Sequence, residues 1–278
     1  MMESVLMKLD DCTFIVKTFE RPQAVRDLIT SIRKFYPDVL ILVADDSQKP
    51  KPIRAKKVKF YALPFDMGLS YGRNFLVNLV KTKYTVLLDD DFIFNKDTKI
   101  EKFKRALDTT SVDIVAGDVE NDDKLLHYRG LLEREGNILY YRQGNRGKVG
   151  NIVLKDLVLN FFMARTSTLK KYPWDDNLKV AEHTDWMWRT KGEIKKGYLA
   201  GVKVVNSRAP YEGDMERFRK RGKEFTYKFM DKHNLKKIVQ FDGLAFTNPR
   251  YADSPFEEIQ QAAREAYQKR ALVDTDKP

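Results

Sequence analysis

In the first half of the chain, short apolar runs rich in β-branched residues alternate with stretches whose apolar residues recur at helical spacing. This alternation is typical of a mainly parallel sheet that is covered by helices. A chain of 278 residues with 42% hydrophobic content is long enough to bury the core of one large α/β domain. The expected strands are Cys12 to Lys17, Val39 to Ala44, Val58 to Leu63 and Tyr84 to Leu88.

The second half of the chain departs from this alternation. An aromatic and basic stretch, Leu125 to Gln143, surrounds the turn sequence Glu135-Gly136-Asn137 and predicts a hairpin beside the sheet. The other expected elements are a helix at Ala181 to Lys191, a strand at Tyr198 to Val205, and helices at Met215 to His233 and Pro255 to Leu272.

Composition limits the class of protein and its partners. The chain has 51 Lys and Arg against 40 Asp and Glu, and its net charge of +11 would attract nucleotide phosphates, acidic glycans, lipid headgroups or nucleic acid. The single cysteine, Cys12, cannot form an internal disulfide and fits a reducing compartment. No apolar stretch approaches the roughly 18 residues that cross a bilayer. We therefore expect a soluble cytoplasmic protein that has no transmembrane segment and contacts acidic surfaces peripherally.

Three consecutive carboxylates, Asp89, Asp90 and Asp91, follow the apolar strand that ends at Leu88. In an open α/β sheet, ligand groups gather beyond the carboxyl ends of the strands. Adjacent carboxylates repel one another unless a cation or hydrogen-bond donors compensate them, and hard divalent ions prefer oxygen ligands. We therefore predict a binding site for a divalent cation, Mn²⁺ or Mg²⁺, at this strand end. The alternative is an acidic loop that caps the following helix.

Two further segments could contribute to the same site. Asp45 and Asp46 follow the strand Val39 to Ala44, and one of these carboxylates could accept the imino hydrogen of a uracil ring, although Asp-Asp-Ser is also an ordinary turn sequence. The glycines of Gly68 to Asn74 would let the backbone approach a ligand closely. Arg73 in this segment could bind a carboxylate or phosphate through two parallel hydrogen bonds.

Glu182 and Asp185 are three residues apart, so on a helix they share one face. One of them could point into a cleft and act as the general base that takes a proton from a hydroxyl. The alternatives are that Glu182 is a residue of the helix start and that His183 is a structural imidazole. Nearby Trp186 and Trp188 are expected in the core rather than as platforms for a sugar.

The segments IVKTFERP, LVADDS, GLSYGRN, TVLLDDDF and EHTDWMWR, in this order, resemble the inverting glycosyltransferases of family 2, which have the GT-A fold. They are especially similar to the catalytic domain of β-1,4-N-acetylgalactosaminyltransferases, in which comparable KTF, ADDS, GRN and DDDF segments occur. The resemblance spans Cys12 to Val205. It implies a GT-A type α/β domain with a Rossmann-like mixed sheet over residues 1–207. A helical C-terminal region over residues 208–278 would pack on the acceptor side.

The resemblance also implies how the donor is bound. Thr18 and Asp46 would line the nucleoside pocket, and Asp89 would lie near the ribose. Arg73 and Asp90 would complete the donor site.

The resemblance further implies a metal and a mechanism. Asp91 would be the direct metal ligand, and Asp185 would remove the acceptor proton while the hydroxyl attacks the anomeric carbon opposite the departing UDP. Relatives often have a histidine just after the strand that corresponds to Val202 to Val205, where this chain has Asn206, Ser207 and Arg208. Arg208 could instead supply positive charge to the diphosphate, or His183 could contribute from elsewhere.

We therefore predict a metal-assisted hexosyltransferase that moves GalNAc, GlcNAc, Gal or Glc from UDP to the hydroxyl of a glycan or another acceptor, including an anionic one. One rival is a sugar nucleotidyltransferase, which should carry a Gly-rich basic loop directly after its first strand. The segment KTFERP contains no glycine. The other rival is a protein with a degenerate transferase fold that binds nucleic acid or acidic glycans through its basic surface.

Overall fold

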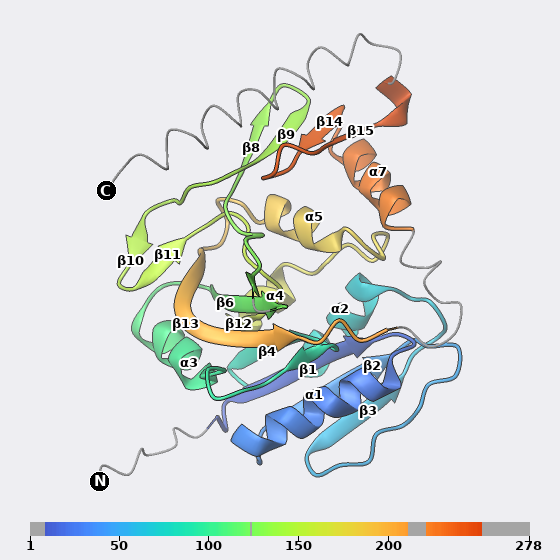
Figure 1. Cartoon of the computed structure of the whole chain (residues 1–278), viewed down its shortest axis with the longest axis vertical. Coiled ribbons are helices and arrows are strands. Elements are labelled where there is room, and N and C mark those ends of the chain that lie inside the picture. The colour runs from blue at the N-terminus through green and yellow to red at the C-terminus, as the bar shows by residue number, and fades with distance from the viewer. Residues whose placement is uncertain (1–8, 123, 211–220, 252–278) are drawn as a thin grey trace.

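A large mixed β-sheet forms the centre of the protein (Figure 1). The computed structural model describes residues 9–122, 124–210 and 221–251. The strands of this sheet are β1 (Cys12–Thr18), β2 (Leu40–Asp45), β3 (Val58–Ala62), β4 (Tyr84–Asp89), β5 (Phe92–Ile93), β6 (Ile114–Asn121), β7 (Lys124–Leu125), β10 (Lys148–Val149), β11 (Ile152–Leu154), β12 (Phe162–Arg165) and β13 (Lys196–Asn206).

The strand order brings three parallel strand ends together. The order is β10-β11-β13-β6-β12-β4-β1-β2-β3, with β5 beside β13 and β7 beside β6. Strands β4, β1, β2 and β3 run parallel, whereas β12 is antiparallel to both β4 and β6. All seven residues of β1 are buried, as expected for a central strand of a sheet that is covered on both faces. The carboxyl ends of β1, β2 and β4 therefore meet at one edge.

Helices cover both faces of this sheet. They are α1 (Pro22–Phe35), α2 (Leu69–Leu79), α3 (Ile100–Thr109), α4 (Thr166–Lys171) and α5 (Glu182–Arg189). Helix α7 (Gly222–Lys232) and the 3₁₀ helix η1 (Pro249–Tyr251) belong to the C-terminal region and lie away from this sheet (Figure 1). Because side chains alternate along a strand, Phe14 and Val16 of β1 pack in the core cluster that includes α1 and α3, and Ile15 packs in the cluster that includes α2, α4 and α5. The predicted α/β class is therefore confirmed. No helix in the described part of the chain is both long and apolar enough to cross a bilayer.

Most elements lie where the sequence predicts them. The first residues of β1, β2, β3 and β4 agree with the expected strands to within one residue. Helix α1 begins at Pro22, whose ring fixes φ and whose missing N–H is not needed in the first turn. The predicted hairpin is also present, and Gly136 in its turn has a φ of 56°, a left-handed conformation that glycine adopts readily.

A smaller sheet lies across α5 from the large sheet (Figure 1). Strand β14 runs parallel to β9 in this sheet, so the region after residue 207 completes a sheet that the hairpin begins. The sequence predicts a helical C-terminal region, but its described part has α7 followed by two strands, of which one pairs with the hairpin and the other pairs with that strand. The strands are β8 (Leu131–Glu135), β9 (Ile138–Arg142), β14 (Lys237–Val239) and β15 (Ala245–Thr247), in the order β15-β14-β9-β8.

Part of the predicted C-terminal region lies outside the described residues. The helix expected at Pro255 to Leu272 falls there, as does the first part of the helix expected from Met215. A domain boundary after residue 207 stays a prediction.

Asp185 joins α5 to α7 through charge pairs. Its side chain is fully buried, and it accepts hydrogen bonds from Nε of Arg189 and Nε2 of His233, each at 2.7 Å. The Nζ atom of Lys232 lies 2.9 Å away. Burial alone would raise the pKa of this carboxyl, but the hydrogen bonds from its three partners outweigh burial and lower the pKa of Asp185 to about 2. Asp185 therefore tethers α7 to α5.

We predict that Asp185→Asn lowers the free energy of unfolding at neutral pH by about 2 kcal/mol, because the pKa of about 2 lies below the ordinary value of 3.8. A carboxylate with a depressed pKa stabilises the fold above its unfolded pKa, and this contribution is lost as the pH falls through the folded pKa. The difference between variant and parent should therefore shrink as the pH falls from about 4 toward about 2. Urea unfolding followed by circular dichroism measures it.

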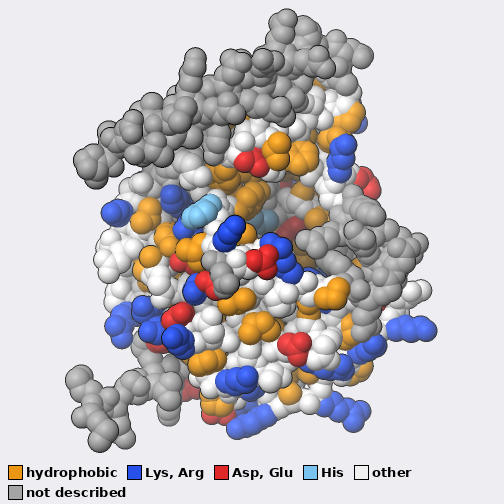
Figure 2. Space-filling view, in the orientation of Figure 1, with side chains coloured by type: hydrophobic (Ala, Val, Ile, Leu, Met, Phe, Trp, Pro, Cys, Tyr) orange, Lys and Arg blue, Asp and Glu red, His pale blue; other side chains and the backbone are white. Residues whose placement is uncertain are grey.

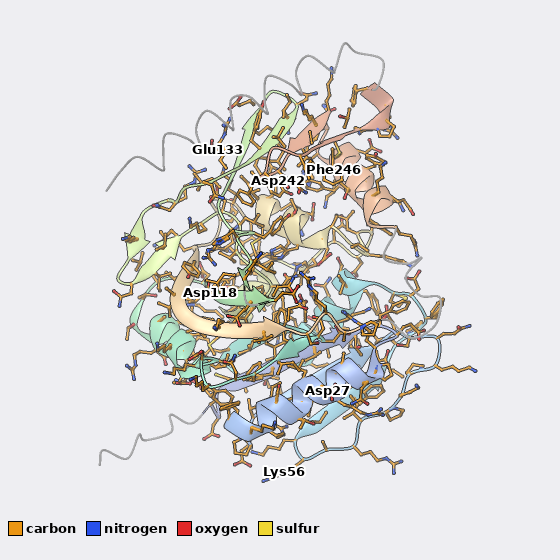
Figure 3. The ribbon with its side chains drawn as sticks, viewed as in Figure 1. Asp27, Lys56, Asp118, Glu133, Asp242 and Phe246 are labelled. Carbon is orange, nitrogen blue, oxygen red and sulfur yellow. The ribbon has the colours of Figure 1, made fainter. Side chains whose placement is uncertain are left out.

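The matched control is Asp27→Asn, at an exposed position on α1 (Figure 3). It should change the free energy of unfolding by less than about 0.5 kcal/mol over the same pH range. An Asp185→Asn effect that stays constant across this range would contradict a role for the ionised carboxylate.

Candidate active site

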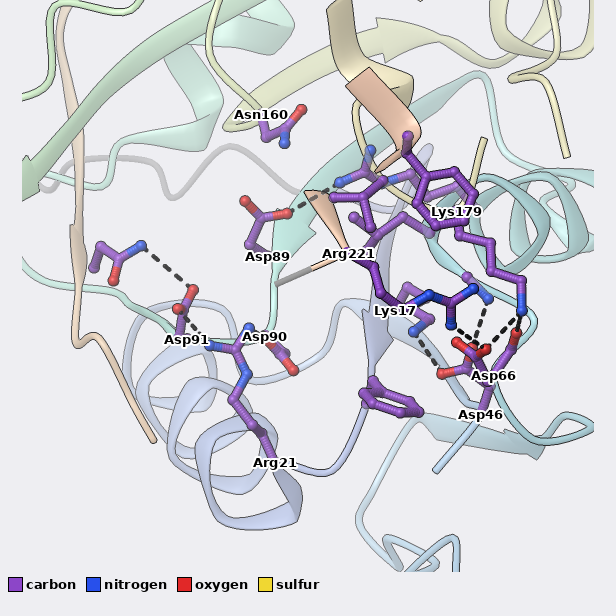
Figure 4. A pocket seen from close by; sticks show the side chains of 17 residues that line it. Lys17, Arg21, Asp46, Asp66, Asp89, Asp90, Asp91, Asn160, Lys179 and Arg221 are labelled. Carbon is purple, nitrogen blue, oxygen red and sulfur yellow. Dashed lines mark hydrogen bonds and ion pairs between the residues drawn. The ribbon is translucent and has the colours of Figure 1, made fainter. Parts of the chain in front are cut away.

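A pocket of about 310 Å³ opens at the carboxyl ends of β1, β2 and β4, where the predicted site lies (Figure 4). Five of its lining residues are acidic and five are basic. The charges of the lining are thus balanced, so a bound anion would need an additional cation or a change of ion-pair partners. The charged lining residues are Lys17, Arg21, Asp46, Asp66, Arg73, Asp89, Asp90, Asp91, Lys179 and Arg221.

Two guanidinium groups compensate the three carboxylates that follow β4. The Nη2 atom of Arg21 lies 2.5 Å from Oδ1 of Asp90, and its Nη1 atom lies 2.8 Å from Oδ2 of Asp91. Arg73 lies with Nη2 3.2 Å from Oδ1 of Asp89. The residue before α1 and a residue of α2 therefore supply the positive charge that three adjacent carboxylates require.

The surroundings raise the pKa of Asp89 to about 7. Loss of solvation is the main cause, and the charges of Asp90 and Asp91 add to it, whereas Arg73 acts in the opposite direction. The pocket therefore disfavours the ionised form of Asp89. A proton or a cation beside Asp89 would relieve this repulsion.

Asp46 and Thr18 occupy different positions relative to the pocket. Asp46 lines it, pairs with Nζ of Lys17 at 2.5 Å and accepts a hydrogen bond from the backbone N–H of Gly68 at 2.8 Å. Burial raises the pKa of Asp46, and Lys17 opposes this effect. Thr18 is not a lining residue, because its buried Oγ1 donates to Oδ2 of Asp90 at 2.7 Å. Thr18 thus orients a carboxylate from behind the wall, instead of lining a nucleoside pocket as the resemblance implies.

Arg73 is a buried bridge between three elements. Its Nη1 lies 2.5 Å from Oε1 of Glu182 at the start of α5, while its Nη2 faces Asp89 at the end of β4. Only 1% of Arg73 is exposed, so this guanidinium is part of the structural framework as well as of the pocket lining.

The two acids of α5 have different partners. Glu182 is buried and contacts Arg73, which lines the pocket. Asp185 does not line the pocket, and its carboxylate faces the basic residues of α5 and α7 described above. The structure therefore does not bring Asp185 together with the carboxylates at the strand ends. Its carboxylate is instead held at the end of α7 by Lys232 and His233.

Several lining residues have no role in the sequence analysis. Lys17 and Arg21 belong to the segment KTFERP, whose position after the first strand is the signal that could have identified them. Asn160 precedes β12, and its side-chain Oδ1 is buried without a hydrogen-bond partner in the described part of the chain. A buried amide oxygen without a partner is costly and marks a position where a ligand could donate a hydrogen bond.

Asp66 holds two further basic side chains at the pocket (Figure 4). Its Oδ2 pairs with Nζ of Lys179 at 2.7 Å and with Nη1 of Arg221 at 2.8 Å. Arg221 lies just before α7, so the C-terminal region contributes directly to the lining. Sequence spacing gives no signal for these contacts, because they join residues more than a hundred positions apart.

The chemistry of the donor set limits how a metal could be held. Among the described residues, no group of three or more His, Cys, Asp or Glu side chains could hold an ion. Asp91 pairs with Arg21 and accepts a hydrogen bond from Nδ2 of Asn206 at 3.4 Å. Nε2 of His183 lies 2.6 Å from a backbone carbonyl, and Arg208 pairs with an exposed aspartate. A cation at Asp91 would therefore need oxygen ligands from the substrate phosphates, as is common for Mg²⁺.

The chain is similar in sequence to named transferases. Residues 13–172 match the family described as Glycosyl transferase family 2. The chain is 39% identical over 202 residues to β-1,4 N-acetylgalactosaminyltransferase 1 of Rattus norvegicus and 36% identical over 199 residues to β-1,4 N-acetylgalactosaminyltransferase 2 of Mus musculus. These matches cover 69% and 70% of this chain, but only 38% of each relative. The chain thus spans well under half the length of these relatives.

The fold is similar to that of solved structures. S. aureus TarS 1-349 aligns with a TM-score of 0.53 at 16% identity, over 80% of this chain and 64% of that chain. TarS 1-349 in complex with UDP aligns with a TM-score of 0.51 at 15% identity, over 96% and 72%. These likenesses confirm the predicted GT-A type fold. Because the family match covers more than half of the residues, the chain belongs to glycosyl transferase family 2.

Proposed function

We propose that this chain is a metal-assisted, inverting hexosyltransferase that moves a sugar from a UDP-sugar to an acceptor hydroxyl. The observation that carries this proposal is the pocket in which Asp46, Arg73 and the three carboxylates after β4 converge. The names of the relatives support N-acetylgalactosamine as the first donor sugar to test, before GlcNAc, Gal and Glc. The UDP complex of TarS supports a uridine nucleotide.

In the proposed donor complex, Asp46 accepts the imino hydrogen of uracil. Lys17 and the N–H of Gly68 already fix this carboxylate at the wall of the pocket, so little side-chain freedom is lost on binding. Asp89 lies on the side of the pocket toward Asn160 and faces the ribose or the donor sugar (Figure 4). The buried Oδ1 of Asn160 accepts a hydrogen bond from a sugar hydroxyl, so this oxygen gains the partner that it lacks.

The balanced charge of the pocket is the reason for including a cation. A diphosphate adds negative charge to a lining with equal numbers of acidic and basic residues. Mn²⁺ or Mg²⁺ held by Asp91 and the phosphates would neutralise the charge that appears on the leaving group. Arg21, which now pairs with Asp91, would then turn to the diphosphate or remain with Asp90.

The geometry favours Glu182 over Asp185 as the proton acceptor. Asp185 is fully buried, and its pKa of about 2 makes it a weak base. Glu182 is one contact away from the pocket, through Arg73. When an acceptor is bound, Glu182 would take the proton of its hydroxyl while the oxygen attacks the anomeric carbon and the bond to UDP breaks.

The cation proposal predicts a metal-dependent effect of Asp91→Asn. The variant should weaken UDP-sugar binding in Mn²⁺ far more than in EDTA, because it removes the proposed ligand and not the contacts to the nucleoside. Isothermal titration calorimetry in both conditions measures this, with Asp27→Asn as a control. The same loss of affinity with and without Mn²⁺ would show that Asp91 acts only through Arg21.

The nucleoside proposal predicts that Asp46→Asn loses about 1 to 3 kcal/mol of UDP affinity, the usual scale for a hydrogen bond to a charged group. The affinity for inorganic pyrophosphate should stay close to that of the parent, because pyrophosphate has no base to recognise. An equal loss for both ligands would indicate a general change in the pocket. Unchanged UDP affinity would place the base elsewhere.

The base proposal predicts that Glu182→Gln lowers the turnover number by about 10² to 10⁴-fold, the usual contribution of a general base, while UDP-sugar affinity is retained. Asp185→Asn, measured on the folded fraction of the protein, should change turnover much less. A radiochemical transfer assay combined with calorimetry separates the two effects. If Asp185→Asn abolishes transfer and Glu182→Gln does not, the base is Asp185, as the family resemblance implies.

A further inference from the structure

A second cavity, of about 320 Å³, lies between α5, α7 and the small sheet. We call it the upper cavity. Each surrounding element contributes a side chain to its lining: Tyr141 from β9, Thr184 from α5, Phe229 from α7 and Phe246 from β15. Phe246 lies on the small sheet near α7 (Figure 3). The volume of the upper cavity is within the range of about 300 to 1,000 Å³ that is common for small-molecule sites.

The upper cavity combines aromatic faces with neutral polar groups, and Lys223, the charged residue of its described lining, has its Nζ over the ring of Tyr227, which does not line the cavity. Tyr128, Tyr141, Phe229 and Phe246 supply four rings, and a small number of hydroxyl and amide groups lie between them. The cavity contains no carboxylate among its described lining residues. A pyranose ring has one face of C–H groups and an edge of hydroxyl groups, so it matches an aromatic wall with a few neutral hydrogen-bonding groups.

Two polar features of the lining are placed for such a ligand. The hydroxyl of Tyr141 donates to Oγ1 of Thr184 at 2.9 Å, and the hydroxyl of Tyr128 lies 3.3 Å from the same atom, which forms a buried cluster of three hydroxyls. The side-chain amide of Gln240 has no hydrogen-bond partner among the described residues, although its backbone pairs with Leu244. An amide can both donate to and accept from sugar hydroxyls.

The upper cavity adjoins the donor pocket. Val180 lines both, and Ala181 and Thr184 of the same segment line the upper cavity. Ala181 has a φ of 63°, a left-handed conformation that is uncommon for a residue other than glycine and tends to occur at functional sites. The next residue, Glu182, is the proposed base. The segment 180–182 therefore lies beside both spaces and carries the proposed base, which contacts the donor-pocket residue Arg73.

We propose that the upper cavity binds the acceptor as a neutral sugar ring. This inference rests on the proposed function. The reacting hydroxyl of the acceptor is directed past Val180, its oxygen forms the new bond to the anomeric carbon, and its proton passes to Glu182. The bond between the anomeric carbon and the diphosphate breaks, and its electron pair leaves with UDP. Recognition depends on the rings of Tyr128 and Phe246 and on the amide of Gln240.

The test uses simple acceptor fragments with the whole chain in the presence of UDP and Mn²⁺. The probes are the methyl β-pyranosides of galactose, glucose and N-acetylglucosamine, with glycerol and N-acetylserine amide to represent lipid-type and peptide-type hydroxyls. Binding is measured by saturation-transfer difference NMR on the parent and on Phe246→Ala and Gln240→Ala. Leu244→Ala is the matched control, because Leu244 lies on the same hairpin, is 54% exposed and does not line the cavity.

We expect at least one glycoside to bind the parent, and its dissociation constant to rise about tenfold in both cavity variants, equivalent to about 1.4 kcal/mol. Leu244→Ala should bind like the parent, and UDP affinity by calorimetry should be unchanged in all variants. The inference is overturned if no glycoside binds, if only the glycerol or serine probe binds, or if the cavity variants bind as tightly as the parent. If the parent binds no UDP, the proposed function itself fails, so the two failures are distinguishable.

Discussion

The structure of the pocket depends on compensation of the carboxylates that follow β4. Asp90 has almost no exposed surface, and an unpaired charge in such a place would cost several kcal/mol. Arg21 and Arg73 provide the compensation, and each of these guanidiniums therefore fixes the segment that carries it. Because Arg73 also pairs with Glu182, the same charge network fixes the start of α5, although the two residues are 109 positions apart.

This network accounts for the chemistry that we propose. A sheet edge that held only carboxylates would bind a cation strongly and would repel a diphosphate. A sheet edge that held only basic residues would bind the diphosphate and keep it after the reaction. The pocket has equal numbers of both, so the nucleotide and the cation would be bound together and released together. Loss of solvation is the main cause of the raised pKa of Asp89, and the charges of Asp90 and Asp91 add to it because Arg73 compensates them only in part.

The sequence predicts those parts of the site that depend on local pattern. The positions of Asp46 and Asp89 follow from apolar strands that end in acidic residues, and the parallel arrangement of these strands brings the two together. The burial of Asp185 could not be predicted in this way. Helical spacing places it on the same face as Glu182, but its partners lie on α7, and no local pattern reveals a pair that only tertiary packing forms.

The small sheet shows the same limit, and it also suggests how the molecule divides its tasks. Strand β14 pairs with β9 across about a hundred residues, so a C-terminal region that reads as helical contributes strands to a sheet that the hairpin begins. Helix α5 lies between this sheet and the large one (Figure 1), and the face of the molecule seen in Figure 2 carries hydrophobic, basic and acidic side chains side by side. The donor pocket is thus built mainly at the ends of parallel strands, with Arg221 and Phe225 added from the start of α7, whereas the upper cavity is built from α5, α7 and the small sheet. Substitutions in the small sheet could therefore alter the choice of acceptor without changing the charge network that holds the donor. Two segments would have to satisfy both sites. One contains Val180 and Glu182, and the other is the start of α7, where Phe225 lines the donor pocket and Thr226 lines the upper cavity.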